Sequence, residues 1–247
     1  MKYFAKIRFS GTNFFGFQVQ PDKRTVQGEL TRALELAFDA PCRITGCSRT
    51  DAGVHANELC ITIETDGNKI PANRLPLAVT RFLPEDLSLF FAKECDGDFH
   101  VRHDVVYKEY LYRIKNSKLP DPFEFMRAWF LPREIDGEKI SLMNEAAKRI
   151  IGRRDFSAFM AEGSDVADTV RCVTSLTVEK VGDIVEIRIC ADGFLYNMVR
   201  IIVGTLGEVA YGRFSPDDVE KIIATRERKN AGMTAPAHGL YLNRVVY

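Results

Sequence analysis

The chain has 247 residues, of which 46% are hydrophobic and 28% charged, a balance typical of one large or two small globular domains. No apolar run reaches the ~18 residues that a membrane span needs, and residues 1–6 lack the apolar core of a signal peptide, so we expect a cytoplasmic protein with no membrane contact. The 34 basic residues equal the 34 acidic ones, which argues against a nonspecific polyanion binder, although charge can gather on one face. Six scattered cysteines without a CxxC pair favour free thiols over a zinc site.

The first half of the chain carries the patterns of alternating strands and helices. Residues 2–10 alternate polar and apolar side chains with a period of two, which predicts a half-buried strand. Thr25 is suited to cap a helix, because four apolar residues recur after it at helical spacing: Val26, Leu30, Leu34 and Phe38. Further strands are predicted over residues 42–47, 59–63 and 87–94, with a short helix over residues 73–82.

Residues 106–114, at the end of the first half, predict a strand with Tyr110 and Tyr112 on one face. The second half follows a similar pattern, and its residues 169–190 predict a hairpin that turns at Gly182-Asp183. Helices are predicted over residues 139–151, 191–209 and 216–224, the last capped by Ser215. Prolines and acids in residues 120–125 indicate a linker or an insertion near the start of this half.

One stretch between two predicted strands gathers the groups of an active site: Cys47-Ser48-Arg49-Thr50-Asp51-Ala52-Gly53-Val54-His55-Ala56. An arginine, a hydroxyl, a carboxylate and a glycine lie within five residues at the end of a rigid scaffold, where catalytic residues tend to occur. Asp51 is the candidate catalytic residue, and Arg49 can pair with it or hold a phosphate. Because Thr-Asp-Ala-Gly is also an ordinary turn sequence, a purely structural interpretation stays open.

A second stretch, residues 191–209, is apolar nearly all round and therefore predicts a buried helix. Arg200 lies in the middle of it. A buried guanidinium without a partner is costly, so Arg200 either extends to the edge of the helix or meets a carboxylate. The second alternative points to Asp51.

Six motifs, in order along nearly the whole chain, resemble the TruA family of tRNA pseudouridine synthases. The stretch around Asp51 is similar to the family's Gly-Arg-Thr-Asp-x-Gly-Val-His, with Ser48 in place of the first glycine. The other five are similar in the same way: Phe9 to Gln18, with Phe17 for a tryptophan; Phe99 to Arg102 before a Tyr-x-Tyr strand; Gly152 to Phe159; Met198 to Gly204; and Ala235 to Leu242.

The resemblance implies an α+β fold with two similar halves of mixed, mainly antiparallel sheet, helices on one side of each, and a central active-site cleft. We place the halves at residues 1–115 and 116–247. It also implies a homodimer that acts on tRNA and isomerises uridine to pseudouridine in the anticodon stem-loop, at tRNA positions 38, 39 or 40. No cofactor and no metal are expected, because the uracil itself is both leaving group and returning nucleophile.

By this resemblance Asp51 is the catalytic carboxylate, acting as a nucleophile or as the base that removes a sugar proton, and the sequence leaves both routes open. Arg200 would keep Asp51 charged, Arg49 would hold the flipped nucleotide, and Tyr110 would stack on the uracil. The substrate-binding residues that the resemblance implies are Arg49, His100, Arg102, Tyr110, Arg200 and Leu240.

Two rival functions stay open on the sequence. A noncatalytic RNA-binding module would need an aromatic base-stacking motif such as Lys-Gly-Phe-Gly-Phe-Val, which the sequence lacks. A hydrolase would want a second carboxylate beside Asp51, and Glu58 is the near candidate. Three phenylalanines in the loop of residues 11–23 are suited either to the core or to base stacking: Phe14, Phe15 and Phe17.

Overall fold

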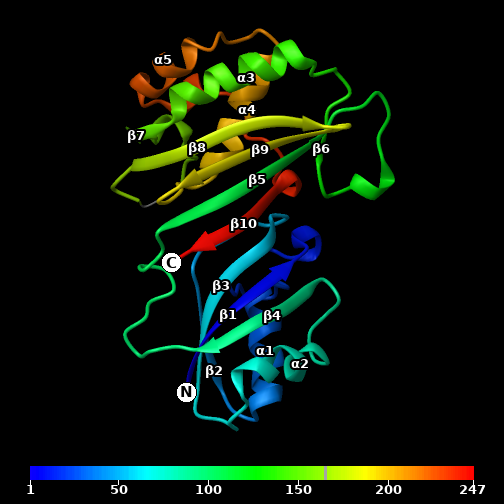
Figure 1. The fold of residues 1–247 in the computed structure, drawn as a ribbon, viewed down its shortest axis with the longest axis vertical. Helices are drawn as coiled ribbons and strands as arrows, with labels where there is room; N and C mark the ends of the chain where they lie inside the picture. Colours follow the sequence, from blue (N-terminus) through cyan, green and yellow to red (C-terminus); the bar gives the residue numbers. More distant parts are fainter. Residues whose placement is uncertain (164–165) are drawn as a thin grey trace. The chain divides into compact units, whose positions relative to one another are not determined.

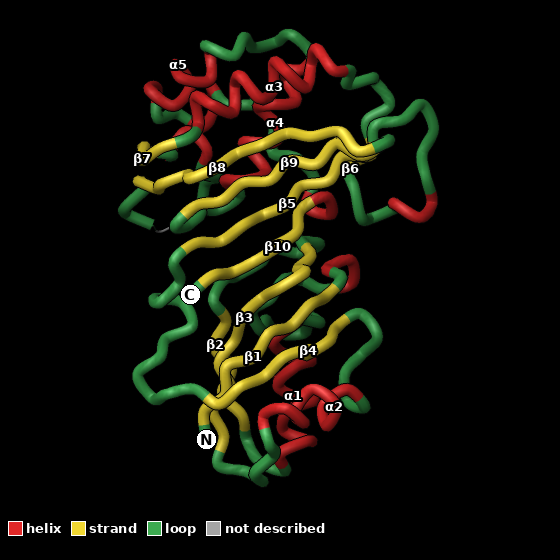
Figure 2. Tube along the Cα trace, in the orientation of Figure 1, coloured by secondary structure: helices red, strands yellow, loops and turns green. Residues whose placement is uncertain are grey.

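The structure is a computed structural model that describes residues 1–163 and 166–247 (Figure 1). The chain forms two compact units, one of Met1–Val106 with Tyr241–Tyr247 and one of Tyr107–Leu240. Each unit is a mainly antiparallel sheet with helices against one face, so the predicted α+β class is confirmed (Figures 1 and 2). The first unit ends earlier than residue 115 and takes in the end of the chain, because the last strand pairs with it. The cleft between the halves stays a prediction.

The first unit is built around its longest strand, β3. The elements of this unit are β1 (Lys2–Phe9), α1 (Val26–Phe38), β2 (Cys42–Gly46), β3 (His55–Thr65), α2 (Leu75–Thr80), β4 (Leu87–Glu94) and β10 (Leu240–Val246). The sheet runs β4-β1-β3, and β3 pairs with β2 through residues 61–65 and with β10, in parallel, at His55 and Ala56. The start of β3 therefore has neighbours on both edges, beside the candidate loop.

The sequence located most of these elements correctly. Thr25 caps α1 as predicted, since its hydroxyl accepts the N–H of Gly28 at 3.3 Å. The main difference lies in β3, which begins at His55 and not at residue 59. Its first residues do not alternate in polarity, and pairing with distant strands makes them a strand. The helix predicted over residues 73–82 is shorter: the α-helix runs from Leu75 to Thr80 with Pro76 in its first turn, where proline is tolerated, and Ala72–Arg74 form a 3-10 turn before it.

The strands of the second unit are hydrogen-bonded in the order β5-β9-β8-β7, with β6 parallel to β5. Its elements are β5 (Tyr107–Lys115), β6 (Trp129–Phe130), α3 (Gly137–Ile150), β7 (Gly152–Asp155), β8 (Val170–Val181), β9 (Ile184–Ala191), α4 (Met198–Ala210) and α5 (Asp218–Thr225). The predicted hairpin is confirmed: Val181 pairs with Ile184 across a turn in which Gly182 has a φ of 59°.

Residues 120–125 form an insertion inside the second unit, between β5 and β6. Arg113 donates two hydrogen bonds to the carboxylate of Glu124, at 2.9 and 3.0 Å, and Lys115 pairs with Asp121 at 3.3 Å. These ion pairs fix the insertion to β5, so the linker interpretation was wrong.

The last helix, α5, begins later than predicted, at Asp218. The Ser215 hydroxyl still accepts the backbone N–H of Asp218 at 3.3 Å.

Helix α4 is buried, as its apolar sequence predicts. Every residue of Met198–Ala210 is buried except Arg200 and Glu208. The helix begins at Met198 and not at residue 191, because Asn197 has left-handed backbone geometry with a φ of 58° and ends the preceding loop.

In the described ranges 1–163 and 166–247, no helix is long and apolar enough to cross a lipid bilayer.

Two glycines of α4 predict opposite effects of the same substitution. A Cβ at Gly204 would overlap the backbone carbonyl of Met233, whereas a Cβ at Gly207 would meet no atom of the described residues within 4 Å. We expect Gly204→Ala to lower the free energy of unfolding by about 1–3 kcal/mol through overpacking. Gly207→Ala should raise it by about 0.5–1 kcal/mol, since alanine is the better helix former. Urea unfolding of both variants checks this, and a loss of stability in Gly207→Ala would contradict it.

Candidate functional site

The candidate loop, residues 47–54, joins the end of β2 to the start of β3, as predicted. Cys47 donates its N–H to the carbonyl of Cys60 at 2.9 Å, so the ladder between these strands extends one residue into the loop. At its far end Val54 donates to the carbonyl of Asp51 at 3.1 Å, and Gly53 has a φ of 79°. This is a tight turn with glycine at the position where a type II turn requires a positive φ. Asp51 is thus the first residue of a turn anchored to two strands.

A second segment, residues 11–17, lies behind this loop and holds its backbone on both sides of Asp51. Phe17 donates its N–H to the carbonyl of Thr50 at 3.0 Å. Gly53 donates its N–H to the carbonyl of Phe14 at 3.3 Å. These hydrogen bonds restrain the residues flanking Asp51, so the carboxylate projects from a backbone with little freedom.

The two segments approach so closely that glycine is required at the contacts. Gly16 has a φ of 86°, and a Cβ there would lie 2.7 Å from the carbonyl oxygen of Thr50. A Cβ on Gly11 would collide with the carbonyl oxygen of Val54. Any side chain at either position would push the loop away from the segment behind it.

His55 links the loop to the strands around it. Its side chain is buried, Nδ1 accepts the N–H of Gly11 at 3.0 Å, and its ring stacks on that of Tyr241 at 4.5 Å. The histidine of the motif therefore connects β3, β10 and the segment of residues 11–17.

The aromatic residues of this segment mostly belong to the core. Phe14 and Phe17 are buried, and the Phe17 ring packs against Gly46 so closely that a Cβ there would lie 2.7 Å from it. Phe15 is exposed and lies 4.6 Å from the ammonium of Lys23. The core interpretation is thus confirmed for two of the three rings.

The remaining candidates of the first unit are exposed. Arg49 lies on the surface of the candidate loop, and His100 and Arg102 lie on the loop that follows β4. The His100 ring shapes its own turn, because Nδ1 accepts the N–H groups of Arg102 and His103, both at 3.2 Å. Asp104 completes the turn by accepting the N–H of His100 at 2.9 Å.

The second unit carries Tyr110, Arg200 and Leu240. Tyr110 lies on β5, buried, with its ring edge-to-face with Phe194 at 4.9 Å. Leu240 is buried at the first position of β10. Stacking on a base stays a prediction for Tyr110, which in this structure packs on another ring.

Arg200 ties helix α4 to the segment that leads into β10. Its Nε donates to the carbonyl of Ala235 and its Nη1 to the side-chain oxygen of Asn197, both at 2.7 Å. Ala235 in turn donates its N–H to the Arg200 carbonyl at 3.1 Å. The guanidinium thus has a fixed direction within the second unit, and a planar donor group held in this way is well suited to a carboxylate or phosphate.

Tyr112 and Gly239, which sequence reasoning did not single out as site residues, fix the same segment. The Tyr112 hydroxyl donates to the carbonyl of Pro236 at 2.8 Å, and Gly239 packs so closely on the Tyr112 ring that a Cβ would lie 2.6 Å from it. Burial raises the pKa of Tyr112 well above its usual value, so it remains a donor. Burial and the charge of Arg200 lower the pKa of His238, which favours a neutral imidazole. Tyrosine spacing alone could have indicated only packing.

The sequence of this chain matches those of known proteins over nearly its whole length. A sequence model of the family described as tRNA pseudouridine synthase matches residues 5–104 and 146–247. The tRNA pseudouridine synthase A of Bacillus licheniformis is 43% identical, covering 100% of this chain and 99% of its own, and that of Bacillus subtilis is 42% identical with the same coverage. A protein of Clostridium tetani named tRNA pseudouridine synthase A 2 is 42% identical over 98% of this chain and 97% of its own.

Among solved structures, a Cbf5-Nop10-Gar1 complex aligns with 98% of this chain and 58% of its own at 12% identity, with a TM-score of 0.37, a likeness too distant to bear on function. The sequence matches suffice without it. The chain belongs to the tRNA pseudouridine synthase family, as the sequence motifs predicted.

The close contact behind Asp51 predicts a large effect of one methyl group. Gly16→Ala should destabilise the protein by about 1–3 kcal/mol more than Gly212→Ala, through overpacking against Thr50. Gly212 has a similar φ of 78°, but a Cβ there would meet no atom of the described residues within 4 Å, so it controls for backbone strain. Urea unfolding of both variants measures the difference, and equal losses would show that the contact carries no energy.

Proposed function

We propose that this protein isomerises uridine to pseudouridine in tRNA, with Asp51 as the catalytic carboxylate. The observation that carries the proposal is the restrained turn at Asp51, whose flanking residues are both hydrogen-bonded to the segment behind them. Membership in the tRNA pseudouridine synthase family supports the same reaction. The names of the relatives support tRNA as the substrate.

The reaction breaks the bond between uracil N1 and the ribose C1′, turns the base, and forms a bond from C5 to C1′. The proton on C5 is then lost and N1 gains one, so the product is an isomer. A carboxylate at Asp51 can act in two ways: it attacks C1′ as a nucleophile, or it removes a sugar proton as a base. Both routes require Asp51 to be ionised.

Arg200 is proposed to keep Asp51 ionised. A guanidinium held by Ala235 and Asn197 keeps its orientation before the carboxylate arrives, so little entropy is lost on pairing. This pairing remains a prediction from the family pattern and from the cost of placing an arginine in an apolar helix.

The other residues are proposed to bind the RNA. Arg49, exposed two residues before Asp51, would hold the flipped nucleotide through its phosphate. Tyr110 would stack on the uracil and Leu240 would line the pocket beside it. His100 and Arg102, exposed on one loop of the first unit, would contact the backbone of the stem.

We further propose that the target uridines are at positions 38, 39 or 40 of the anticodon stem-loop, that the protein is a homodimer, and that it works in the cytoplasm. The family motifs support the first two statements. Six free cysteines agree with a reducing compartment.

The rival hydrolase finds less support in the site. Glu58, its candidate second carboxylate, forms an ion pair with Lys6 at 3.0 Å on the neighbouring strand. Glu58 is therefore engaged within the sheet by a lysine that has no role in the hydrolase mechanism.

Replacing Asp51 separates these functions. Wild-type protein should release tritium from tRNA carrying 5-tritiated uridine, and Asp51→Asn should lose at least ~10³-fold in rate while still binding tRNA, because the side chain keeps its shape but loses its charge. Asp39→Asn is the matched control, since Asp39 is exposed at the end of α1 in a left-handed conformation that asparagine also adopts. Release by Asp51→Asn at the wild-type rate would exclude the proposed role.

The target positions can be mapped independently. Primer extension on tRNA treated with a carbodiimide that marks pseudouridine should give stops at positions 38, 39 or 40 and nowhere else in the anticodon arm. Stops confined to another arm of the tRNA would preserve the reaction and overturn the assigned positions.

A further inference from the structure

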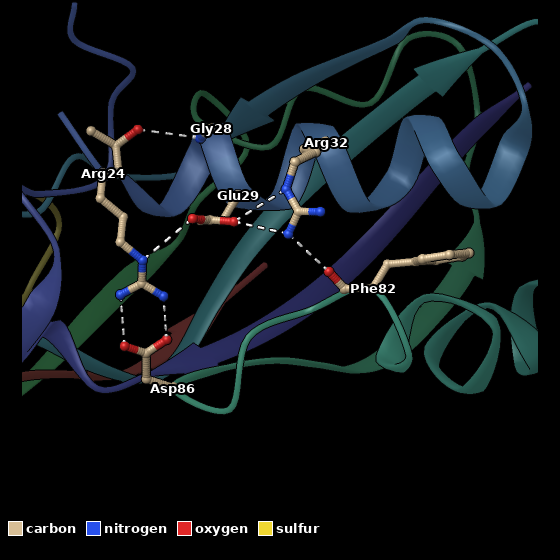
Figure 3. A network of polar contacts seen from close by, with 7 residues as sticks. Arg24, Gly28, Glu29, Arg32, Phe82 and Asp86 are labelled. Carbon is tan, nitrogen blue, oxygen red and sulfur yellow. Dashed lines mark hydrogen bonds and ion pairs between the residues drawn. The ribbon is translucent and has the colours of Figure 1, made fainter. Parts of the chain in front are cut away.

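Arg24 is the centre of a polar network in the first unit (Figure 3). Its two terminal nitrogens donate to the two carboxylate oxygens of Asp86, each at 2.8 Å, and its Nε donates to Glu29 at 3.3 Å. A bidentate arginine–carboxylate pair fixes both distance and orientation. The Arg24 hydrogen bond also lowers the pKa of Asp86, which favours the charged form of that carboxylate.

Arg24 is joined to the segment behind the candidate loop. Its guanidinium lies 4.2 Å from the centre of the Phe14 ring, and its backbone carbonyl accepts the N–H of Phe15 at 2.9 Å. Phe14 is the residue whose carbonyl accepts the N–H of Gly53, two residues after Asp51. One side chain therefore connects Asp86 to the turn that carries the proposed catalytic carboxylate.

Asp86 binds both ends of a longer stretch, residues 10–24, which contains the segment of residues 11–17. Its carboxylate binds Arg24, and its backbone carbonyl accepts the N–H of Ser10 at 3.0 Å. Residues 10–24 leave β1 and return to α1, so one residue closes the segment at its beginning and at its end. Fixing both ends of a loop reduces its freedom far more than fixing one.

We propose that Arg24 is a positioning residue for Asp51, and that the Arg24–Asp86 pair keeps the segment of residues 10–24 tight enough to hold the turn at Asp51. The proposal rests on the function proposed above for Asp51. Arg24 itself has no place in the chemistry. It acts through Phe14, Phe15 and the backbone of the loop.

Arg32 offers a matched control within the same network. It donates to Glu29 at 3.1 Å and to the carbonyl of Phe82 at 3.1 Å, and it lies on the other side of Glu29 from Arg24 (Figure 3). These two partners belong to α1 and to the turn after α2, and both lie outside residues 10–17. Arg32→Ala thus removes an arginine and its hydrogen bonds from the network while leaving the Arg24–Asp86 pair in place.

The first test is independent of activity. Amide hydrogen exchange of peptides covering Phe17 and Gly53 should become about 10-fold faster in Arg24→Ala than in wild type, because these amides report on the contact between segment and loop. Arg32→Ala should leave their exchange unchanged. Equal exchange in wild type and Arg24→Ala would overturn the proposal, whatever reaction the protein catalyses.

The second test separates positioning from RNA binding. Arg24→Ala should lower kcat for tritium release by about 10–100-fold with KM for tRNA unchanged, since misplacing a reacting group by about 1 Å can cost about 100-fold in rate. Arg24→Lys should recover part of the loss, because lysine keeps the charge but not the bidentate geometry. Arg32→Ala should match wild type.

The double variant shows whether Arg24 acts through Asp86. Arg24→Ala with Asp86→Ala should lose no more kcat than Arg24→Ala alone.

Two outcomes of the kinetic tests would overturn the proposal. A higher KM with normal kcat in Arg24→Ala would mean that Arg24 binds RNA directly. Equal losses of kcat in Arg24→Ala and Arg32→Ala would mean that the Arg24–Asp86 pair has no special role. If Arg24→Ala does not fold, Arg24→Lys and Asp86→Asn carry the same comparison. No release by wild type would refute the proposed function, while the exchange test would still decide the role of Arg24.

Discussion

The contact between two backbone segments, residues 11–17 and 50–54, is the constraint on which the first unit depends. It brings carbonyl groups close to Gly11 and Gly16, where a side chain cannot fit. The same segment donates and accepts the hydrogen bonds that flank Asp51, and its carbonyls at Gly16 and Phe17 accept the first N–H groups of α1. A loop restrained in this way presents a carboxylate without reorganising, which is what electrostatic catalysis requires.

The second unit also packs backbone closely at glycines next to a charged side chain, Arg200. Gly204 and Gly232 allow helix α4 to lie directly against the chain at Met233, and Gly239 allows the chain to pass over Tyr112. Arg200 is directed by hydrogen bonds to this closely packed chain. In both units, a charged side chain projects from backbone that is packed against other backbone, where glycine makes the approach possible.

Local patterns in the sequence predicted the fold well and located the loop that carries the candidate site, whose residue roles stay predictions. Period-two alternation located β1 and β4, helical spacing located α1, and the motif located the turn at Asp51. The start of β3 at His55 was missed, because pairing with β10 depends on residues almost 190 positions away. The insertion at residues 120–125 was ambiguous for a related reason: its ion pairs to Arg113 and Lys115 are set by strand geometry and not by composition.

The two interpretations of Thr-Asp-Ala-Gly turn out to be compatible. The residues form an ordinary turn, and the turn is what gives Asp51 a defined direction. A motif therefore marks where chemistry can occur, but the stiffness that the chemistry needs comes from residues outside it. Arg24 and Asp86 are separated by 62 positions, and neither stands out in a sequence with 34 basic and 34 acidic residues. Such support becomes visible only when the chain is folded, because it depends on which charges the strands bring together.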